Sequence, residues 1–194
     1  MQTEIIDING IDREVLTETN NFFGLFTPES AEKLAADDIK RTLAGKFLLR
    51  RMIRRMYGER PVNIRYGING KPELDFCFFS ISHSGNYAAC AVSDRPCGID
   101  IEISREIKQR KKYPLFTEDE CRYVNVRDSA NRFLTLWTMK EAFVKANGGR
   151  LADAAKAELV KNGAPVNKLG EYGFKTYTAD GYLYSVCEYG VKNI

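Results

Sequence analysis

The sequence contains a single histidine and a single tryptophan, and its five cysteines form no CxxC pair. Zinc sites usually combine cysteine and histidine at short spacings, so we expect no zinc centre of that kind. No run of about 18 apolar residues is present that could span a bilayer. The first residues, MQTEIIDING, have neither the basic start nor the apolar core of an export signal. Because the cysteines lie mostly in apolar runs, we expect reduced thiols, a cytoplasmic protein and no membrane partner.

The length of 194 residues fits one large domain or two small lobes that share a core. The net charge is only +3, but seven basic and no acidic residues lie in 40–55, and five bases and one acid lie in 105–112. Such patches suggest an anionic partner, although a solvated helix face has the same composition. The patches lack the interleaved aromatic residues of a single-strand binder, so we expect no nucleic acid.

The hydrophobic pattern predicts an α+β fold with a long helix and a cluster of strands in each half of the chain. We expect helices over about 28–57 and 128–147, and strands at 3–8, 76–82, 87–94 and 97–103. Thr117 followed by Glu120 marks another helix start. A terminal hairpin is expected to turn at Asp180-Gly181.

The stretch WTMKEAFVKANGGRL, residues 137–151, concentrates reactive side chains. Read as a helix, it brings four side chains to neighbouring positions because they are three to four residues apart: Trp137, Lys140, Glu141 and Lys145. An ordinary surface salt bridge between Glu141 and Lys145 would give the same spacing.

Asp100 and Glu102 lie two residues apart in the apolar run GIDIEI. In a strand they project from the same face, and the isoleucines point to the other face. Adjacent carboxylates raise each other's pKa unless a cation lies between them. Mg²⁺ commonly binds one or two protein carboxylates together with water and phosphate oxygens. An exposed acidic strand face is the alternative, and a third oxygen ligand from Glu141 would favour the metal.

Two short segments could contact phosphate. Ser82-His83-Ser84-Gly85 combines hydroxyls, an imidazole and a glycine that allows close backbone approach, although a structural histidine fits the same place. Gly70-Lys71-Pro72 would hold a lysine on a rigid turn, which alone is a weak signal.

The motifs GKP, ISHSG, GIDIE and WTMKEAFVK, in this order, resemble those of the 4'-phosphopantetheinyl transferases. The spacing is similar to that of the longer, pseudo-dimeric class typified by the enzyme of surfactin synthesis. This resemblance implies two similar α/β lobes related by a pseudo-two-fold axis, each a small antiparallel sheet packed on a long helix. Residues 1–97 and 98–194 would form the lobes, with the active site in the cleft between them.

The resemblance also implies a reaction. Phosphopantetheine would pass from coenzyme A to a serine of an acidic apo carrier protein, with Mg²⁺, and adenosine 3',5'-bisphosphate would leave. It assigns the Mg²⁺ ligands to Asp100, Glu102 and Glu141. It assigns catalytic roles to Glu141 and to Lys145, which would lie near the pyrophosphate. It assigns coenzyme A contacts to Gly70, Lys71, Pro72, Ser82 and His83.

The chain departs from the family pattern at three places. The basic segment before the long helix is shortened to ESAEKLAADD, so we consider Lys33 and Arg41 as substitutes that would hold the 3'-phosphate. Ser80 replaces a commoner asparagine, and the helix exit reads GGRL. We expect a monomer. The alternatives are a non-catalytic paralogue that binds coenzyme A or a carrier, and an unrelated Mg²⁺ enzyme that hydrolyses phosphoesters.

Overall fold

The computed structural model describes residues 1–31, 35–67, 69–108, 112–126 and 128–191. Its α-helices are α1 (Arg13–Phe23), α2 (Pro28–Ala31), α3 (Ala36–Tyr57), α4 (Glu118–Val124) and α5 (Ser129–Asn147). Two 3-10 helices are η1 (Ile8–Gly10) and η2 (Leu151–Lys156). The longer strands are β1 (Gln2–Asp7), β4 (Phe78–Ser84), β5 (Tyr87–Ser93), β6 (Cys97–Ile103), β10 (Tyr172–Ala179) and β11 (Tyr182–Tyr189). The short strands are β2 (Arg65–Tyr66), β3 (Pro72–Glu73), β7 (Val160–Lys161), β8 (Ala164–Pro165) and β9 (Lys168–Leu169).

The two main sheets are antiparallel and follow the same path. One has the strand order β1-β5-β4, and the other has the order β6-β11-β10-β9. In each, a first strand leads to a long helix and then to a hairpin whose second strand pairs with the first strand. The predicted α+β class with small antiparallel sheets and helices is confirmed.

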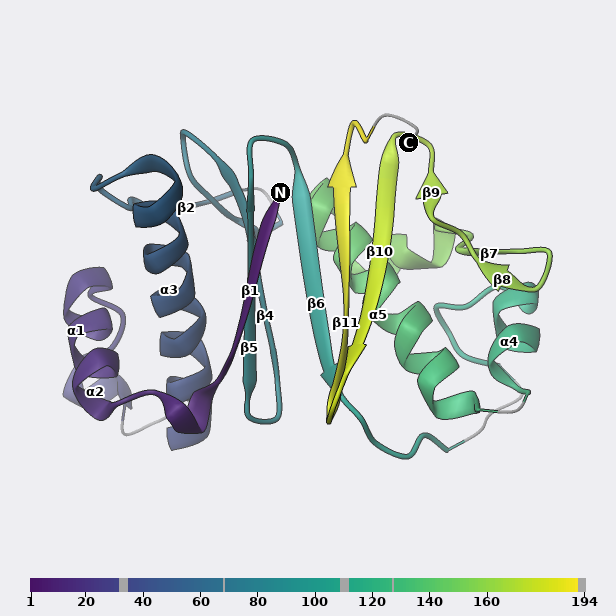
Figure 1. The fold of residues 1–194 in the computed structure, drawn as a ribbon, viewed down its shortest axis with the longest axis horizontal. Helices are drawn as coiled ribbons and strands as arrows, with labels where there is room; N and C mark the ends of the chain where they lie inside the picture. The colour runs from purple at the N-terminus through teal and green to yellow at the C-terminus, as the bar shows by residue number, and fades with distance from the viewer. Residues whose placement is uncertain (32–34, 68, 109–111, 127, 192–194) are drawn as a thin grey trace.

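The helices lie on the outer faces of the two sheets (Figure 1). α3 covers the first sheet through a core that includes Leu48 and Met52. α5 covers the second sheet through a core that includes Leu136 and Met139. A third core, with Ile99 and Ile101 of β6 at its centre, lies between the sheets. The isoleucines of the DxE strand are therefore buried on the face opposite the carboxylates, as predicted.

Several boundaries differ from the predictions. The helix expected over 28–57 is divided, because α2 ends at Ala31 and α3 begins at Ala36. α1 was not predicted; it buries Leu16 and Thr19, and Phe23 packs partly buried against the first core. The capping box at Thr117 and Glu120 is confirmed. The terminal hairpin is also confirmed, with Gly181 in the left-handed region at φ +83°. No helix of the described residues is both long and apolar enough to cross a membrane.

A glycine sets the distance between α5 and β6. A Cβ added at Gly98 would lie 1.9 Å from the carbonyl oxygen of Ala142 and 2.7 Å from the amide nitrogen of Ala146. Only a residue without a side chain allows this approach. Two residues further along the same strand face, Asp100 therefore meets the helix that carries Glu141 and Lys145.

Candidate active site

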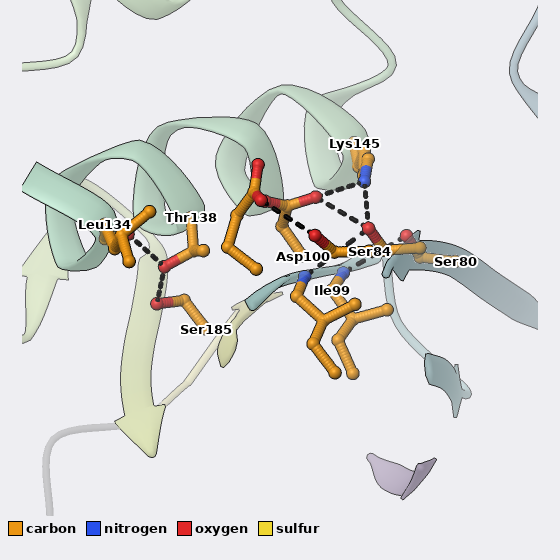
Figure 2. Close-up of polar contacts among 11 residues, drawn as sticks. Ser80, Ser84, Ile99, Asp100, Leu134, Thr138, Lys145 and Ser185 are labelled. Carbon is orange, nitrogen blue, oxygen red and sulfur yellow. Dashed lines mark hydrogen bonds and ion pairs between the residues drawn. The ribbon is translucent and has the colours of Figure 1, made fainter. Parts of the chain in front are cut away.

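A pocket of about 420 Å³ lies where α3, β3, β4, β6 and α5 meet. Five residues predicted from the DxE and WxxKE motifs line it: Asp100, Glu102, Trp137, Glu141 and Lys145. Pro72, Ser82 and His83 line it as well, so the structure brings together residues from all four motifs. Figure 2 shows Lys145 reaching from the helix toward Asp100 on the strand below.

Asp100 is only 6% exposed, and its two oxygens differ sharply. Oδ1 accepts a hydrogen bond from the Ser82 hydroxyl at 2.7 Å and pairs with the Lys145 ammonium, also at 2.7 Å. Lys145 donates to Ser82 Oγ at 3.0 Å as well. Within the described residues, Oδ2 is buried and has no hydrogen-bond partner. A buried oxygen without a donor is costly, so this atom is suited to a bound cation or donor.

Glu141 does not form the i, i+4 salt bridge that its spacing allows, because the Lys145 ammonium pairs with Asp100 instead. The described part of the chain supplies no hydrogen bond or ion pair to Glu141. Desolvation and then the negative charges of Asp100 and Glu102 raise its pKa, and Lys145 partly opposes them. Glu141 is thus a partly buried carboxylate in an excess of negative charge.

Glu102 has the same asymmetry as Asp100. The Ser84 hydroxyl donates to Glu102 Oε2 at 2.9 Å, and the Arg105 guanidinium donates to the same oxygen at 3.3 Å. In the ranges that the structure describes, these donors leave Oε1 for another partner.

The three carboxylates could together hold a divalent cation through their open oxygens. As arranged, no three His, Cys, Asp or Glu side chains of the described chain are close enough to form a metal cluster. Mg²⁺ needs fewer, because it usually binds one or two carboxylates and completes its shell with water and phosphate oxygens. The orphaned Asp100 Oδ2 and the raised pKa of Glu141 both fit such an ion.

His83 lines the pocket close to two basic side chains. His83 is exposed there, and partial desolvation followed by the charges of Lys145 and Arg41 lowers its pKa. Arg41 Nε donates to the Gly85 carbonyl at 3.0 Å, which brings α3 to the end of β4. Lys33, the other residue considered for the 3'-phosphate, lies outside the described residues.

Two lining residues on α3, Thr42 and Lys46, were missed from the sequence. Lys46 is 8% exposed, and burial lowers its pKa. Its ammonium lies over the ring of Phe23, 5.7 Å from the ring centroid. A basic residue on an otherwise apolar helix face was the available signal, but it was read only as part of a basic patch.

The Gly70-Lys71-Pro72 turn contacts the end of α5. Lys71 Nζ donates to the Ala146 carbonyl at 3.3 Å, and the neighbouring Asn69 amide donates to the Gly148 carbonyl at 2.8 Å. These bonds satisfy carbonyls at a helix C-terminus, where positive charge is favourable. The Lys71 side chain thus holds the turn against α5, and Pro72 is the part of the motif that lines the pocket.

Lys140 points away from the site, although the helical spacing placed it beside its neighbours. It is 1% exposed and pairs with Glu120, 0% exposed, at 3.0 Å. Its ammonium also donates to the carbonyls of Ala154 and Ala157, at 2.8 Å and 2.6 Å. The lysine of the WxxKE motif therefore connects α5 to α4 and η2 inside the core.

Most of the bases in 40–55 have local partners. Arg51 and Arg55 pair with Glu4, Arg54 pairs with Glu59, and Arg50 stacks on Phe22. In the second basic patch, Arg105 pairs with Glu102, and residues 109–111 lie outside the described ranges.

Comparison with known proteins agrees with this geometry. The model of the 4'-phosphopantetheinyl transferase superfamily matches residues 96–187. The chain is 33% identical to the 4'-phosphopantetheinyl transferase Sfp of Bacillus subtilis (strain 168), over 91% of this chain and 88% of that protein. It is 32% identical to the 4'-phosphopantetheinyl transferase ffp of Bacillus subtilis, over 88% and 85%. It is 33% identical to the 4'-phosphopantetheinyl transferase HetI of Nostoc sp. (strain PCC 7120), over 62% and 56%. The chain thus belongs to the 4'-phosphopantetheinyl transferase superfamily and is a transferase of the Sfp class.

Proposed function

We propose that the enzyme transfers 4'-phosphopantetheine from coenzyme A to a serine of an apo acyl or peptidyl carrier protein. The serine oxygen would bond to the β-phosphorus of coenzyme A while the bridging bond of the pyrophosphate breaks. Adenosine 3',5'-bisphosphate leaves, and the serine proton passes to the enzyme. The observation that carries this proposal is one pocket lined by three carboxylates and Lys145.

Mg²⁺ would be held by Asp100, Glu102 and Glu141. Asp100 and Glu102 each have one oxygen bound by donors, and Asp100 Oδ2 is buried without a donor in the described chain. The ion would supply positive charge to the pyrophosphate oxygens. This proposal predicts that the metal-free enzyme binds coenzyme A weakly and transfers nothing.

Glu141 is proposed to accept the proton of the carrier serine. Its pKa is raised by desolvation and by Asp100 and Glu102, which makes it a stronger base than an exposed glutamate. Glu141→Ala should abolish transfer in folded protein, whereas Glu171→Ala, which removes an exposed carboxylate outside the pocket, should not. Near wild-type turnover of Glu141→Ala would reject this role.

Lys145 is proposed to stabilise the pyrophosphate, and Asp100 would keep the lysine ammonium in position. This ammonium lies 3.0 Å from Ser82 Oγ and 2.7 Å from Asp100 Oδ1, so these two oxygens hold it in the lining of the pocket. A cation in this place opposes the charge that develops on the leaving group.

Coenzyme A is proposed to contact Gly70, Lys71, Pro72, Ser82 and His83, with Arg41 near His83. The lowered pKa keeps His83 neutral near pH 7, so it would bind a phosphate as a hydrogen-bond donor. His83→Ala should raise the KM for coenzyme A and leave kcat largely unchanged. Complete loss of turnover with unchanged binding would contradict this assignment.

We propose further that residues 1–97 and 98–194 form two lobes related by a pseudo-two-fold axis. The repeated path of strand, long helix and hairpin supports this relation. Because the pocket takes residues from both halves, one chain would suffice for activity, in agreement with a monomer.

The carrier would dock through basic residues near the site. Carrier proteins of this type are acidic, and Arg105 and Lys108 lie beside Glu102 along a hollow that also includes Trp137. Charge steering of this kind weakens with salt, so the KM for the carrier should rise with ionic strength. A KM that ignores salt would count against this docking.

Intact mass spectrometry of an apo acyl carrier protein tests the whole proposal. The carrier is incubated with the enzyme, coenzyme A and Mg²⁺, and a parallel sample contains a chelator. A mass gain of one phosphopantetheine that disappears with the chelator is expected. If several apo carriers stay unmodified although coenzyme A binds, the chain is a non-catalytic binder, and the proposal is wrong.

A further inference from the structure

Among the described strands, β6, which carries Asp100 and Glu102, has a strand partner on one edge and none on the other. It pairs with β11 on one side, and the strand order ends there. In an antiparallel strand, alternate backbone groups point away from the partner. The amide N–H groups of Ile99, Ile101 and Ile103 would therefore be left without a strand to bond to.

Three serines of β4 take the place of that missing strand. Ile99 N–H donates to Ser80 Oγ at 3.1 Å, Ile101 N–H to Ser82 Oγ at 3.4 Å, and Ile103 N–H to Ser84 Oγ at 3.2 Å. Because alternate strand residues share a face, the pattern Ser-x-Ser-x-Ser matches the spacing of the amides. Figure 2 shows Ser80 and Ser84 beside the strand that carries Ile99 and Asp100. We call these three hydroxyls the serine ladder.

The serine ladder also determines where two hydroxyl protons go. A serine oxygen that accepts from an amide keeps one proton to donate. Ser82 donates it to Asp100 Oδ1 at 2.7 Å, and Ser84 donates it to Glu102 Oε2 at 2.9 Å. Each of these two serines thus fixes one oxygen of a carboxylate relative to the backbone of β6, the strand that carries the carboxylate.

Ser80 differs from the other two serines in one respect. The residue of β6 that corresponds to Asp100 and Glu102, two positions earlier, is Gly98, which has no side chain. Ser80 therefore satisfies an amide without orienting a carboxylate.

We propose that Ser84 and Ser82 are positioning residues that orient the metal-binding carboxylates. The hydroxyl of Ser84 holds Oε2 of Glu102 and leaves Oε1 for the ligand. Arg105 cannot replace it, because its guanidinium contacts the same oxygen at the longer distance of 3.3 Å and its side chain is 49% exposed. This inference rests on the proposed function, since it assumes that a divalent cation binds these carboxylates.

The experiment compares Ser84→Ala with Ser80→Ala and Ser84→Thr. Both alanine variants remove a ladder hydroxyl and the hydrogen bond that it accepts from a backbone amide. Only Ser84→Ala also releases a carboxylate. Mn²⁺ affinity is measured by the signal of free Mn²⁺ in electron paramagnetic resonance, with saturating coenzyme A and no carrier. Unfolding in urea is measured for each variant without metal.

Ser84→Ala should weaken Mn²⁺ binding about 10-fold or more, as is usual when a metal-binding side chain loses the hydrogen bond that orients it. Ser80→Ala should change the Mn²⁺ affinity less than about 2-fold. The urea midpoints of Ser80→Ala and Ser84→Ala should fall by similar amounts. Ser84→Thr keeps the hydroxyl and should bind Mn²⁺ like the wild type. In turnover, Ser84→Ala should need more Mg²⁺ for half-maximal rate and keep its KM for coenzyme A.

Two results separate this inference from the function beneath it. If the wild type binds Mn²⁺ and modifies a carrier, but Ser84→Ala and Ser80→Ala have equal Mn²⁺ affinities, the positioning role is wrong and the proposed function stands. If the wild type neither binds Mn²⁺ nor modifies a carrier, the proposed function fails, and the inference fails with it.

Discussion

Replacing Lys140 by methionine should destabilise the protein strongly although the pocket is left intact. The change leaves Glu120, 0% exposed, without the cation that lies 3.0 Å away. It also removes the donor to the carbonyls of Ala154 and Ala157. Removing one partner of a buried ion pair costs about 3–5 kcal/mol, because the other charge stays buried and uncompensated.

The measurement is equilibrium unfolding in urea. With a typical dependence of about 2 kcal/mol per molar urea, the midpoint should fall by roughly 1.5–2.5 M. A matched control is Lys156→Met, which removes an exposed lysine, 81% accessible and paired with Asp153, and should cost less than about 1 kcal/mol.

A second variant tests the cause. In Glu120→Gln/Lys140→Met the buried charge is gone, while an amide oxygen can still accept the N–H of Leu159, which Glu120 Oε1 accepts at 2.8 Å. The double variant should therefore be more stable than Lys140→Met alone. Wild-type stability of Lys140→Met together with lost transfer would refute the reasoning, since it would place Lys140 in the chemistry.

Three further predictions concern packing, pH and thiols. Gly98→Ala should cost about 1–3 kcal/mol or more, because its Cβ would lie 1.9 Å from the Ala142 carbonyl oxygen; Gly10→Ala, with open space around it, is the control in urea unfolding. The pKa of His83 is held below its usual 6.5 by desolvation, Lys145 and Arg41, so the unfolded chain takes up this proton first as the pH falls. Stability from this group is therefore complete above pH 6.5 and is lost toward the lower folded pKa; His83→Gln should flatten that slope, and an unchanged slope would contradict the assignment. All five cysteines are buried, and burial raises the pKa of Cys77 to about 11 and of Cys97 to about 12. A thiol reagent at about pH 8 should label none of them until urea is added, and rapid labelling of the folded protein would contradict their burial.

Local periodicity was sufficient for the parts of the site that lie within one element. The strand period placed Asp100 and Glu102 on one face, and the helix period placed Trp137, Glu141 and Lys145 on another. In both cases neighbours in sequence are neighbours in space. The pattern also explains why the carboxylates face α5 and the isoleucines face the core between the sheets.

The same periodicity could not tell which side of α5 Lys140 faces. Spacing allows it to lie near both Trp137 and Glu141, and its side is decided by Glu120, a partner on another helix. A charged residue in the core is visible only when its partner is located, which a single sequence does not do. Likewise, the alternate serines of β4 were visible, but the amides that they bond belong to a strand in a different sheet.

Sheet membership was also hidden from the sequence. Only a short turn separates β5 from β6, as in a hairpin. The two strands do not pair: β5 pairs with β1 and β4, whereas β6 pairs with β11. Other strands decide this pairing, because β1 and β4 occupy both edges of β5 and leave none for β6. Predicting it requires the tertiary arrangement rather than the local turn.

The position of β6 has a consequence for the order of events during synthesis. The first sheet, with its serines, is complete once β5 has been made, but β6 obtains its only strand partner, β11, from the last hairpin of the described chain. Domains begin to fold from the N-terminus while the rest is being translated. We therefore expect the first sheet to form before β6 has a strand partner, so its serines can already accept the amides of β6 when that strand emerges. The residues that line the pocket all precede that hairpin in the chain, so the last step pairs the strand that carries Asp100 and Glu102 and adds no pocket residue.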